Sequence, residues 1–368
     1  MQHDSDLLFR IALTLVPNVG AVHARTLIEE YGNAGSVFKA KRTALEKIEG
    51  IGTIRANNLK AFHDFARAEE EMKFIEKYRI QPLFITDENY PKRFLHCYDP
   101  PTLLYYRGAI SLNHTKTVSI VGTRTNTPYG RQQTERLIEE LASHDVVIIS
   151  GLAFGIDAIA HKTALKHHLP TIGVVGHGLD TIYPAQHKAL AKEMIAEGGI
   201  LTEFMSRTKP DKHNFPIRNR VVAGISDITI VVETSVKGGS MITAEMANSY
   251  NRDVFAFPGR TTDTKSSGCN YLIKTNKAIL LTDAQQLVEA MGWEDKKKGS
   301  PKLQRELFTD FTDDEKIIID LLKEKEFLTI DELNIVTALS SSAIAAAVLN
   351  LELEGVITAL PGKRYTKM

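Results

Sequence analysis

The sequence predicts an α/β fold in which an extended, parallel or mixed sheet is flanked by an all-helical N-terminal module and a C-terminal winged helix. Three observations predict it. Apolar residues recur at helical spacing over residues 7–75. Short β-branched runs alternate with helix-like stretches over residues 118–290, which is typical of βαβ units. After a charged segment, three helical stretches precede two short strands, which is the element order of a winged helix.

The N-terminal module is expected over residues 1–75. Turn signals at PNVG (17–20), GN (32–33) and EGIG (49–52) divide it into short helices. The turns VPNVG and IEGIG resemble those of helix-hairpin-helix or SAM-like units, whose backbone amides can touch DNA phosphates. Structural packing explains the same turns equally well, so the role of this module stays open.

The central domain is expected over residues 76–292. Its predicted strands, in chain order, are VSIVG, VVIIS, TIGVVG, ITIVVE and VFAFPG. Because helical periodicity separates these runs, the strands should lie parallel, with helices on both faces of the sheet.

A linker is expected over residues 293–304, where WEDKKKGSPK is charged and rich in turn residues. The winged helix should occupy residues 305–368. Its predicted helices lie in DDEKIIIDLLKEK, TIDELNIVTA and SSSAIAAAVLNLELEG, and a Pro-Gly-Lys turn joins the two strands of VITALPGKRYTKM.

The composition of the 368 residues is that of an ordinary globular protein, with 43% hydrophobic and 24% charged residues. Lys plus Arg and Asp plus Glu both number 45, so the net charge offers no steering toward nucleic acid. Any nucleic-acid binding must therefore come from a local basic surface.

The two cysteines, Cys97 and Cys269, are far apart and form no CxxC or Cys/His cluster. Neither a disulfide framework nor a zinc site is expected, and we expect no cofactor or metal. Asp4 and Asp6 stand where a signal peptide would carry basic residues. No run reaches the roughly 18 apolar residues of a membrane span, so we expect a cytoplasmic protein.

The first candidate binding element is Gly122-Thr123-Arg124, which follows the strand VSIVG and precedes a helix expected to begin near Tyr129. Such a strand-to-helix turn directs backbone amides toward an anion, and Arg124 can add a bidentate phosphate contact. An ordinary surface arginine is the alternative, because the run is not the dinucleotide fingerprint GxGxxG.

The second candidate element, the run SGLAFGID, begins with Ser150 and Gly151 at another strand end. Its glycines allow the backbone to approach a ligand, and the Ser150 hydroxyl can donate a hydrogen bond. Tight packing of a helix on the sheet would require the same glycines, so both interpretations stand.

The third candidate element is the run KHNFPIRNR, residues 212–220, in which three cations surround one aromatic ring ahead of a helix. Cations that neutralise phosphates beside a ring that stacks on a base make a single-strand binding platform. Because NFP looks like an irregular turn, we favour stacking over core packing for Phe215. The candidate DNA contacts here are Lys212, Phe215, Arg218, Asn219 and Arg220.

The fourth candidate element is Lys237-Gly238-Gly239-Ser240, a glycine-rich turn between the strand ITIVVE and the stretch MITAEMANSY. Loops at successive strand ends of an open α/β sheet converge on one edge, where ligands sit. We therefore expect all four elements to share one anion site.

These stretches resemble the DNA-processing protein A family, also called DprA or Smf. The matching runs are GTRTNTPYG, SGLAFGIDAIAH, GVVGHGLDTIYPAQH, FPIRNRVVAGIS, VVETSVKGGSMITAEMA, FAFPGR and SGCNYLIKTNKA. They span about residues 118–283, and the flanking units resemble the family's helical module and winged helix.

The resemblance implies an extended Rossmann-type domain that binds single-stranded DNA without sequence preference, protects it, dimerises, and loads the RecA recombinase during natural transformation. It implies Arg124 and Lys212 as phosphate contacts and Phe215 as a ring between bases. Arg218 and Arg220 would line the same pocket.

One position departs from the family's pattern. Some members have a lysine near the Tyr-Pro of the run LDTIYP, whereas here Tyr183-Pro184 is followed by Ala185-Gln186. That contact is absent here or is made by Lys188.

A nucleotide-processing enzyme is the main alternative, because Gly238-Gly239 with Glu245 resembles the PGGxGTxxE loop of nucleoside monophosphate phosphoribohydrolases. Lys237, Met241 and Ile242 replace the Pro, Gly and Thr of that loop, which removes the small residues that wrap a phosphate. We therefore expect a binding protein with no catalytic residue.

A winged-helix transcription factor is the second alternative. The helix SSSAIAAAVLNLELEG carries no Lys or Arg, and Glu352 and Glu354 would repel phosphate. At the turn of the wing, Lys363 and Arg364 are basic, but the helix is not, so we expect this unit to contact protein and to be dispensable for DNA binding.

The histidines His161, His167, His168 and His177 show no ligand spacing with a Cys or acidic partner. We expect them to be ordinary packing or surface residues.

Overall fold

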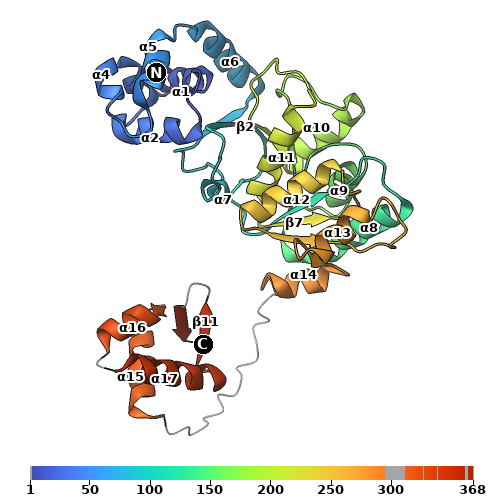
Figure 1. The fold of residues 1–368 in the computed structure, drawn as a ribbon. Coiled ribbons are helices and arrows are strands. Elements are labelled where there is room, and N and C mark those ends of the chain that lie inside the picture. The colour runs from blue at the N-terminus through green and yellow to red at the C-terminus, as the bar shows by residue number, and fades with distance from the viewer. Residues whose placement is uncertain (1, 295–310, 326, 338, 361–363, 368) are drawn as a thin grey trace. The chain divides into compact units, whose positions relative to one another are not determined.

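The computed structural model describes residues 2–294, 311–325, 327–337, 339–360 and 364–367. The chain forms two compact units, Met1–Asp295 and Lys296–Met368, and each is described by itself (Figure 1). Among the described residues, no helix has both the length and the apolar character needed to cross a bilayer.

The first unit begins with the predicted helical module. Its helices are α1 (Gln2–Leu15), α2 (Ala21–Tyr31), α3 (Ala34–Lys39), α4 (Arg42–Leu45), α5 (Gly52–Ala61) and α6 (Phe65–Tyr78). The turn residues allow the chain to reverse between helices, since Asn18 (φ 63°) precedes α2 and Gly50 (φ 80°) precedes α5 in left-handed backbone. The prediction of an all-helical segment over residues 7–75 is confirmed.

The helical module packs on its own aromatic core and is tied to the sheet domain. Its rings lie 5.4 to 5.9 Å apart, and they belong to Phe9, Phe38, Phe62 and Phe65. Arg67 of α6 donates a hydrogen bond to the carbonyl of Ser206 at 2.6 Å, and the buried carboxylate of Glu71 accepts one from the Ser206 amide at 2.9 Å. These contacts join α6 to the loop after β6 of the sheet described next.

A nine-stranded sheet forms the centre of the first unit. Its strands are β1 (Gln81–Phe84), β2 (Leu103–Gly108), β3 (Thr117–Val121), β4 (Val147–Ser150), β5 (Thr171–Val174), β6 (Gly199–Thr202), β7 (Ile228–Val231), β8 (Asp253–Ala256) and β9 (Ile279–Leu280). The strand order is β1-β2-β6-β5-β4-β3-β7-β8-β9. From β6 to β9 in this order, all neighbouring strands are parallel. The pairs β1-β2 and β2-β6 are antiparallel.

The five predicted strands are β3, β4, β5, β7 and β8. The sheet is mixed, which is one of the two forms that the sequence predicts. The sequence interpretation did not assign the antiparallel edge β1-β2 or strand β6.

Helices cover both faces of the sheet, because successive strand residues point to opposite sides. In β3, Val118 and Ile120 pack in one core with α8 (Pro128–Leu141), α9 (Ile156–Lys166) and α14 (Ala284–Ala290). Val121 packs in the other core, with α11 (Asn214–Gly224) and α12 (Gly239–Ser249). The remaining helices are α7 (Lys92–Leu95), α10 (Lys188–Glu197) and α13 (Ser267–Lys274), with short 3-10 turns η1 (Ala142–His144) and η2 (Ala185–His187).

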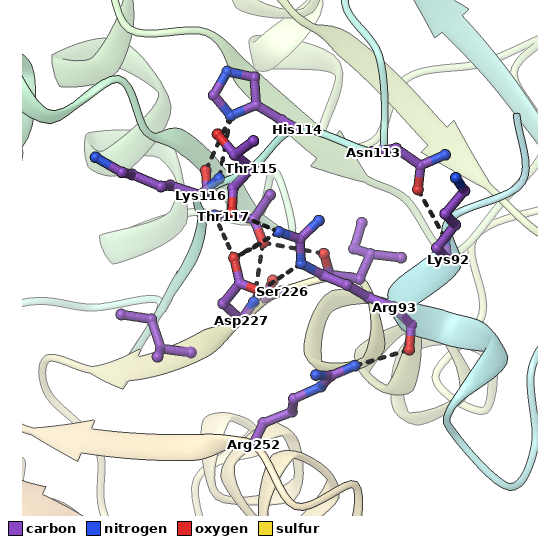
Figure 2. A network of polar contacts seen from close by, with 12 residues as sticks. Lys92, Arg93, Asn113, His114, Thr115, Lys116, Thr117, Ser226, Asp227 and Arg252 are labelled. Carbon is purple, nitrogen blue, oxygen red and sulfur yellow. Dashed lines mark hydrogen bonds and ion pairs between the residues drawn. The ribbon is translucent and has the colours of Figure 1, made fainter. Parts of the chain in front are cut away.

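A polar network closes the amino edge of the sheet, where β3 and β7 begin (Figure 2). Arg93 of α7 donates two hydrogen bonds to the carboxylate of Asp227, at 2.5 and 2.8 Å. The amide and hydroxyl of Thr117 donate to the same carboxylate at 2.8 and 2.9 Å. Arg252 donates to the Arg93 carbonyl at 2.8 Å. At this edge Arg93 and Asp227 therefore form an ion pair, to which Thr117 and Arg252 add hydrogen bonds.

The second unit is a winged helix. Its elements are α15 (Asp313–Glu324), β10 (Leu328–Thr329), α16 (Ile330–Val336), α17 (Ser341–Leu353), β11 (Ile357–Leu360) and β12 (Arg364–Lys367). The three predicted helices and the hairpin are present. Most of the predicted linker and the wing residue Lys363 lie outside the described residues, whereas Trp293 still packs on the core of the first unit.

Candidate nucleic-acid interface

The carboxyl ends of β3, β4 and β7 meet at the topological switch point of the sheet. Strand β3 pairs with β4 on one side and β7 on the other, and the connection after β3 runs toward β4 whereas that after β7 runs the opposite way, toward β8. In open α/β sheets this is where ligands bind. The predicted loops after these three strands therefore converge, as expected.

The loop after β3 is fixed by Glu233, a fully buried residue that follows β7. The amide and hydroxyl of Thr127 donate to the Glu233 carboxylate at 2.8 and 2.7 Å, and the Thr123 amide donates to its carbonyl at 2.7 Å. The loop between these anchors leaves the side chain of Arg124 exposed. Arg124 is thus held in place by its backbone while its guanidinium stays free of any acidic partner among the described residues.

The loop after β4 packs directly against the loop after β3. Gly155 adopts φ 77°, and a Cβ there would lie 2.2 Å from the carbonyl oxygen of Thr123. Only glycine fits, so this residue allows the two loops to touch. The prediction for Ser150 is not supported by its position. Its buried hydroxyl donates to the carbonyl of Ile120 within the sheet, at 2.6 Å, and does not reach the cleft.

Phe215 lies in the first turn of α11 rather than in an irregular turn, which corrects the interpretation of NFP. Proline is tolerated in a first helical turn because the amides there lack intrahelical partners, so Pro216 does not interrupt the helix. The Phe215 ring is half-buried, with the Arg124 guanidinium 5.2 Å from its centroid and the Tyr183 ring stacked at 6.1 Å. A cation and two aromatic faces therefore meet at one place.

These elements enclose an open cleft of about 540 Å³. Of the predicted contacts, it is lined by Gly122, Thr123, Arg124, Gly151, Lys212, Phe215, Arg218, Asn219, Gly238, Gly239 and Ser240. Ser150 and Arg220 do not line it. Lys212 is exposed and, like Arg124, has no ion-pair partner in the part of the chain that the structure describes.

Arg218 lines the cleft but is committed to the fold. The side chain is buried, and its Nη1 donates to the carbonyls of Gly151 and Val174, the latter at 2.5 Å. Burial lowers the pKa of Arg218 and raises that of the buried Asp157 carboxyl, and the attraction between the two groups opposes both shifts. Arg218 thus braces α11 against two strand ends instead of presenting its charge to a ligand.

Arg220 points elsewhere, which corrects the expectation that it shares a pocket with Arg218. Helix positions two apart lie about 200° apart around the axis, so two such side chains cannot face the same way. Arg220 instead binds the carboxylate of Glu203 and the carbonyl of Asp99. Burial raises the pKa of Glu203 to about 7 despite this partner.

The N-terminus of α12 supplies the remaining donors. Its N-cap residue Gly238 makes no side-chain capping bond, and a Cβ there would lie 2.1 Å from the Thr234 hydroxyl. The space beside Gly239 is open, and the buried Ser240 hydroxyl has no hydrogen-bond partner among the described residues. First-turn amides and a free hydroxyl facing a cleft favour an anion such as phosphate.

The histidines form no metal site. His161 is buried with Nδ1 2.7 Å from the Thr171 hydroxyl, and burial lowers its pKa to about 3. His177 is buried between the Gly178 carbonyl and the Tyr183 amide. In the described parts of the chain, no three His, Cys, Asp or Glu side chains gather as a metal site would require.

Sequence reasoning missed two aromatic residues and two anchors of this region. Tyr183 and Phe154 lie within runs that were recognised, but neither was assigned a stacking role, although an aromatic residue in a strand-end loop was a usable signal. Glu233 and Asp157 carried no signal, because only the fold shows that one anchors a loop and the other faces Arg218.

Fold and site together define a Rossmann-type protein with an open cleft at its switch point, and the same chain carries a winged helix. The chain belongs to the DNA recombination-mediator protein A family, whose sequence profile matches residues 81–292. The DprA winged helix domain matches residues 301–363. The resemblance, the extended Rossmann-like core and the winged helix expected from the sequence are thereby confirmed.

Named relatives and solved structures support the same family assignment. The chain is 32% identical to protein Smf from Synechocystis over 99% of both chains. It is similar to the crystal structure of DNA processing protein A from Streptococcus pneumoniae, with a TM-score of 0.66 and 31% identity over 76% of this chain and 95% of that one. DNA processing protein A from Helicobacter pylori, which has a unique single-stranded DNA binding mode, matches with a TM-score of 0.53 and 36% identity over 58% of this chain and 95% of that one.

Proposed function

We propose that this protein binds single-stranded DNA without sequence preference in the cytoplasm, protects it, and loads the RecA recombinase onto it during natural transformation. The observation that carries the proposal is the meeting of Arg124, Phe215 and Tyr183 around a small cavity beside the switch-point cleft. A cation for phosphate beside aromatic faces for bases suits a strand whose bases are unpaired.

Lack of sequence preference follows from the chemistry of the cleft. The donors on which the proposal rests are backbone amides at the start of α12, the Ser240 hydroxyl and two exposed cations, which read phosphate rather than base edges. Every base has a face that can stack on Phe215, so stacking adds affinity without selecting a base.

The proposal includes no catalytic step. The buried carboxylate at the cleft, Asp157, faces Arg218 and accepts a hydrogen bond from the Ala153 amide at 3.3 Å. These partners hold the carboxylate in a structural role. Release of a free base during incubation with AMP or GMP would instead support the phosphoribohydrolase alternative.

We include a homodimer in the proposal, because strand β9 leaves an edge of the sheet open. Ile279 and Leu280 of this strand are 47% and 40% exposed, and Tyr271 of α13 is 40% exposed. An apolar edge strand is a ready surface for a second copy. Ile279→Lys should give a monomer in sedimentation, whereas an unchanged dimer would place the interface elsewhere.

The direct test compares single-stranded and duplex oligonucleotides of equal length in an electrophoretic shift series. We expect a clear preference for the single strand, and equal affinities would contradict the proposal. With Arg124 and Lys212 as the two available cations, the cleft should contribute about −1.4 to the slope of log K against log salt. RecA filament formation on DNA covered by single-strand binding protein, with and without this protein, tests the loading step.

A further inference from the structure

A second hollow lies beside the switch-point cleft, between α8 and α9. It has a volume of about 460 Å³, and Phe154 lies at one end of it. Phe154 also lines a small cavity together with Tyr183, and that cavity shares Arg124 and Phe215 with the switch-point cleft. The three hollows therefore adjoin one another, from the carboxyl edge of the sheet to the surface of α9.

Phe154 sits at the junction of these hollows with its ring 43% exposed. The buried His187 supports it edge-on, with 5.1 Å between ring centroids, and His187 is itself held by a 2.9 Å contact between Nδ1 and the Leu152 carbonyl. Isolated exposed aromatic residues are common, so exposure alone decides nothing. Here, however, His187 holds the ring in place, and the ring also lines the small cavity that Tyr183 lines. A DNA strand that passes Tyr183 would therefore meet Phe154 next.

The two rims of the α8–α9 hollow differ in charge. On α9, Lys162 and Lys166 lie one turn apart, and both are exposed with no ion-pair partner among the described residues. On α8, Glu139 is acidic, and Arg131 is paired with Glu135 at 3.4 Å. A polyanion could follow only the α9 rim.

We propose that a bound single strand continues from the switch-point cleft across Phe154 and along the α9 rim, with Phe154 as a second stacking surface and Lys162 and Lys166 as phosphate contacts. This inference rests on the proposed function and extends it. Short strands fill the switch-point cleft alone, and longer strands also occupy the hollow between α8 and α9.

The test is the dependence of affinity on strand length in the Lys162→Ala/Lys166→Ala double variant. For oligo-dT of about twenty nucleotides, the salt slope should become shallower by about 1.4, because two cations are lost. For about four nucleotides, affinity and slope should match those of the unaltered protein. Lys73→Ala/Lys77→Ala, a pair of exposed lysines at the same spacing on α6, is the matched control and should change neither.

Phe154→Leu tests the stacking surface while keeping an apolar side chain over His187. We expect roughly tenfold weaker binding of the long strand, an unchanged salt slope and an unchanged thermal midpoint. Phe154→Ala should give the same loss, and its midpoint shows whether the ring also supports the fold.

The outcomes separate the two proposals. If the unaltered protein binds no single-stranded DNA, both fail. If it binds but the α9 double variant loses long and short strands equally, or loses neither, the path across Phe154 is wrong and the switch-point site stands. An effect of the α9 lysines confined to RecA loading would make this rim a protein-docking surface and also overturn the path.

Discussion

The two edges of the central sheet use the same residue types in opposite ways. At the amino edge, Asp227 accepts two hydrogen bonds from Arg93 and two more from Thr117 (Figure 2). At the carboxyl edge, Arg124 and Lys212 have no acidic partner among the described residues, and the Ser240 hydroxyl has no partner there. The two unpaired cations of the carboxyl edge line the switch-point cleft, where they can meet a ligand.

The difference shows that the partner of a cation, rather than its presence in a motif, indicates its role. Arg218 illustrates this difference. It lies at the carboxyl edge, but its guanidinium is bound by backbone carbonyls, as that of Arg93 is bound by Asp227 at the amino edge. A paired arginine should affect stability, and an unpaired one should affect binding.

The largest expected effect is that of Arg218→Ala. It should lower the free energy of unfolding by about 3 to 5 kcal/mol, since it leaves the buried carbonyls of Gly151 and Val174 without their donor and removes the cation that attracts the buried Asp157 carboxyl. Urea unfolding measures this loss, and adding Asp157→Asn should recover part of it. A fully stable variant that no longer binds DNA would restore Arg218 as a phosphate contact and break the comparison.

The next test compares one arginine from each edge of the sheet. Arg93→Ala should cost about 2 to 3 kcal/mol of stability, because charged hydrogen bonds to Asp227 are lost, and should leave DNA affinity unchanged. Arg124→Ala should do the reverse, with unchanged stability and at least about tenfold weaker binding. The two variants are measured side by side by thermal unfolding and fluorescence anisotropy.

Phe215→Ala separates the contribution of base stacking to DNA affinity from the contribution of charge. It should weaken binding by about 1 to 3 kcal/mol without changing the salt slope, because it removes a base platform and no cation. The thermal midpoint provides the control. A loss of about 3 to 5 kcal/mol in stability with normal DNA binding would identify Phe215 as a core residue.

Lys212→Ala should have a smaller effect, confined to charge. The affinity should fall equally for all base sequences, and the salt slope should become shallower by about 0.7. A titration of oligo-dT and mixed-sequence strands at several salt concentrations measures both quantities. Unequal losses among sequences would show that Lys212 reads bases.

The smallest effect is expected from deleting residues 305–368. Helix α17 carries no Lys or Arg, and its cap residue Glu354 is exposed, so this surface should contribute little to DNA binding. We expect less than a tenfold change in affinity. A larger loss would make the winged helix a second DNA-binding unit.

The parallel core could be predicted because buried strands such as β4 and β7 are continuous β-branched runs. The antiparallel edge was missed because β1 contains a proline and β6 begins with glycine, which weakens the strand pattern. The loops of the candidate site were found because glycines and cations follow the predicted strands directly. Partners remote in sequence, such as Gly151 for Arg218 and Glu203 for Arg220, could not be found in this way.

The brace formed by Arg218 has a consequence for the kinetics and selectivity of binding. Because it fixes the first turn of α11 to two strand ends, the Phe215 ring needs no rearrangement when a strand arrives. The ordering cost then falls on the nucleic acid, which must separate its own stacked bases. A thymine tract, whose bases stack weakly, should therefore associate faster and bind more tightly than an adenine tract of equal length.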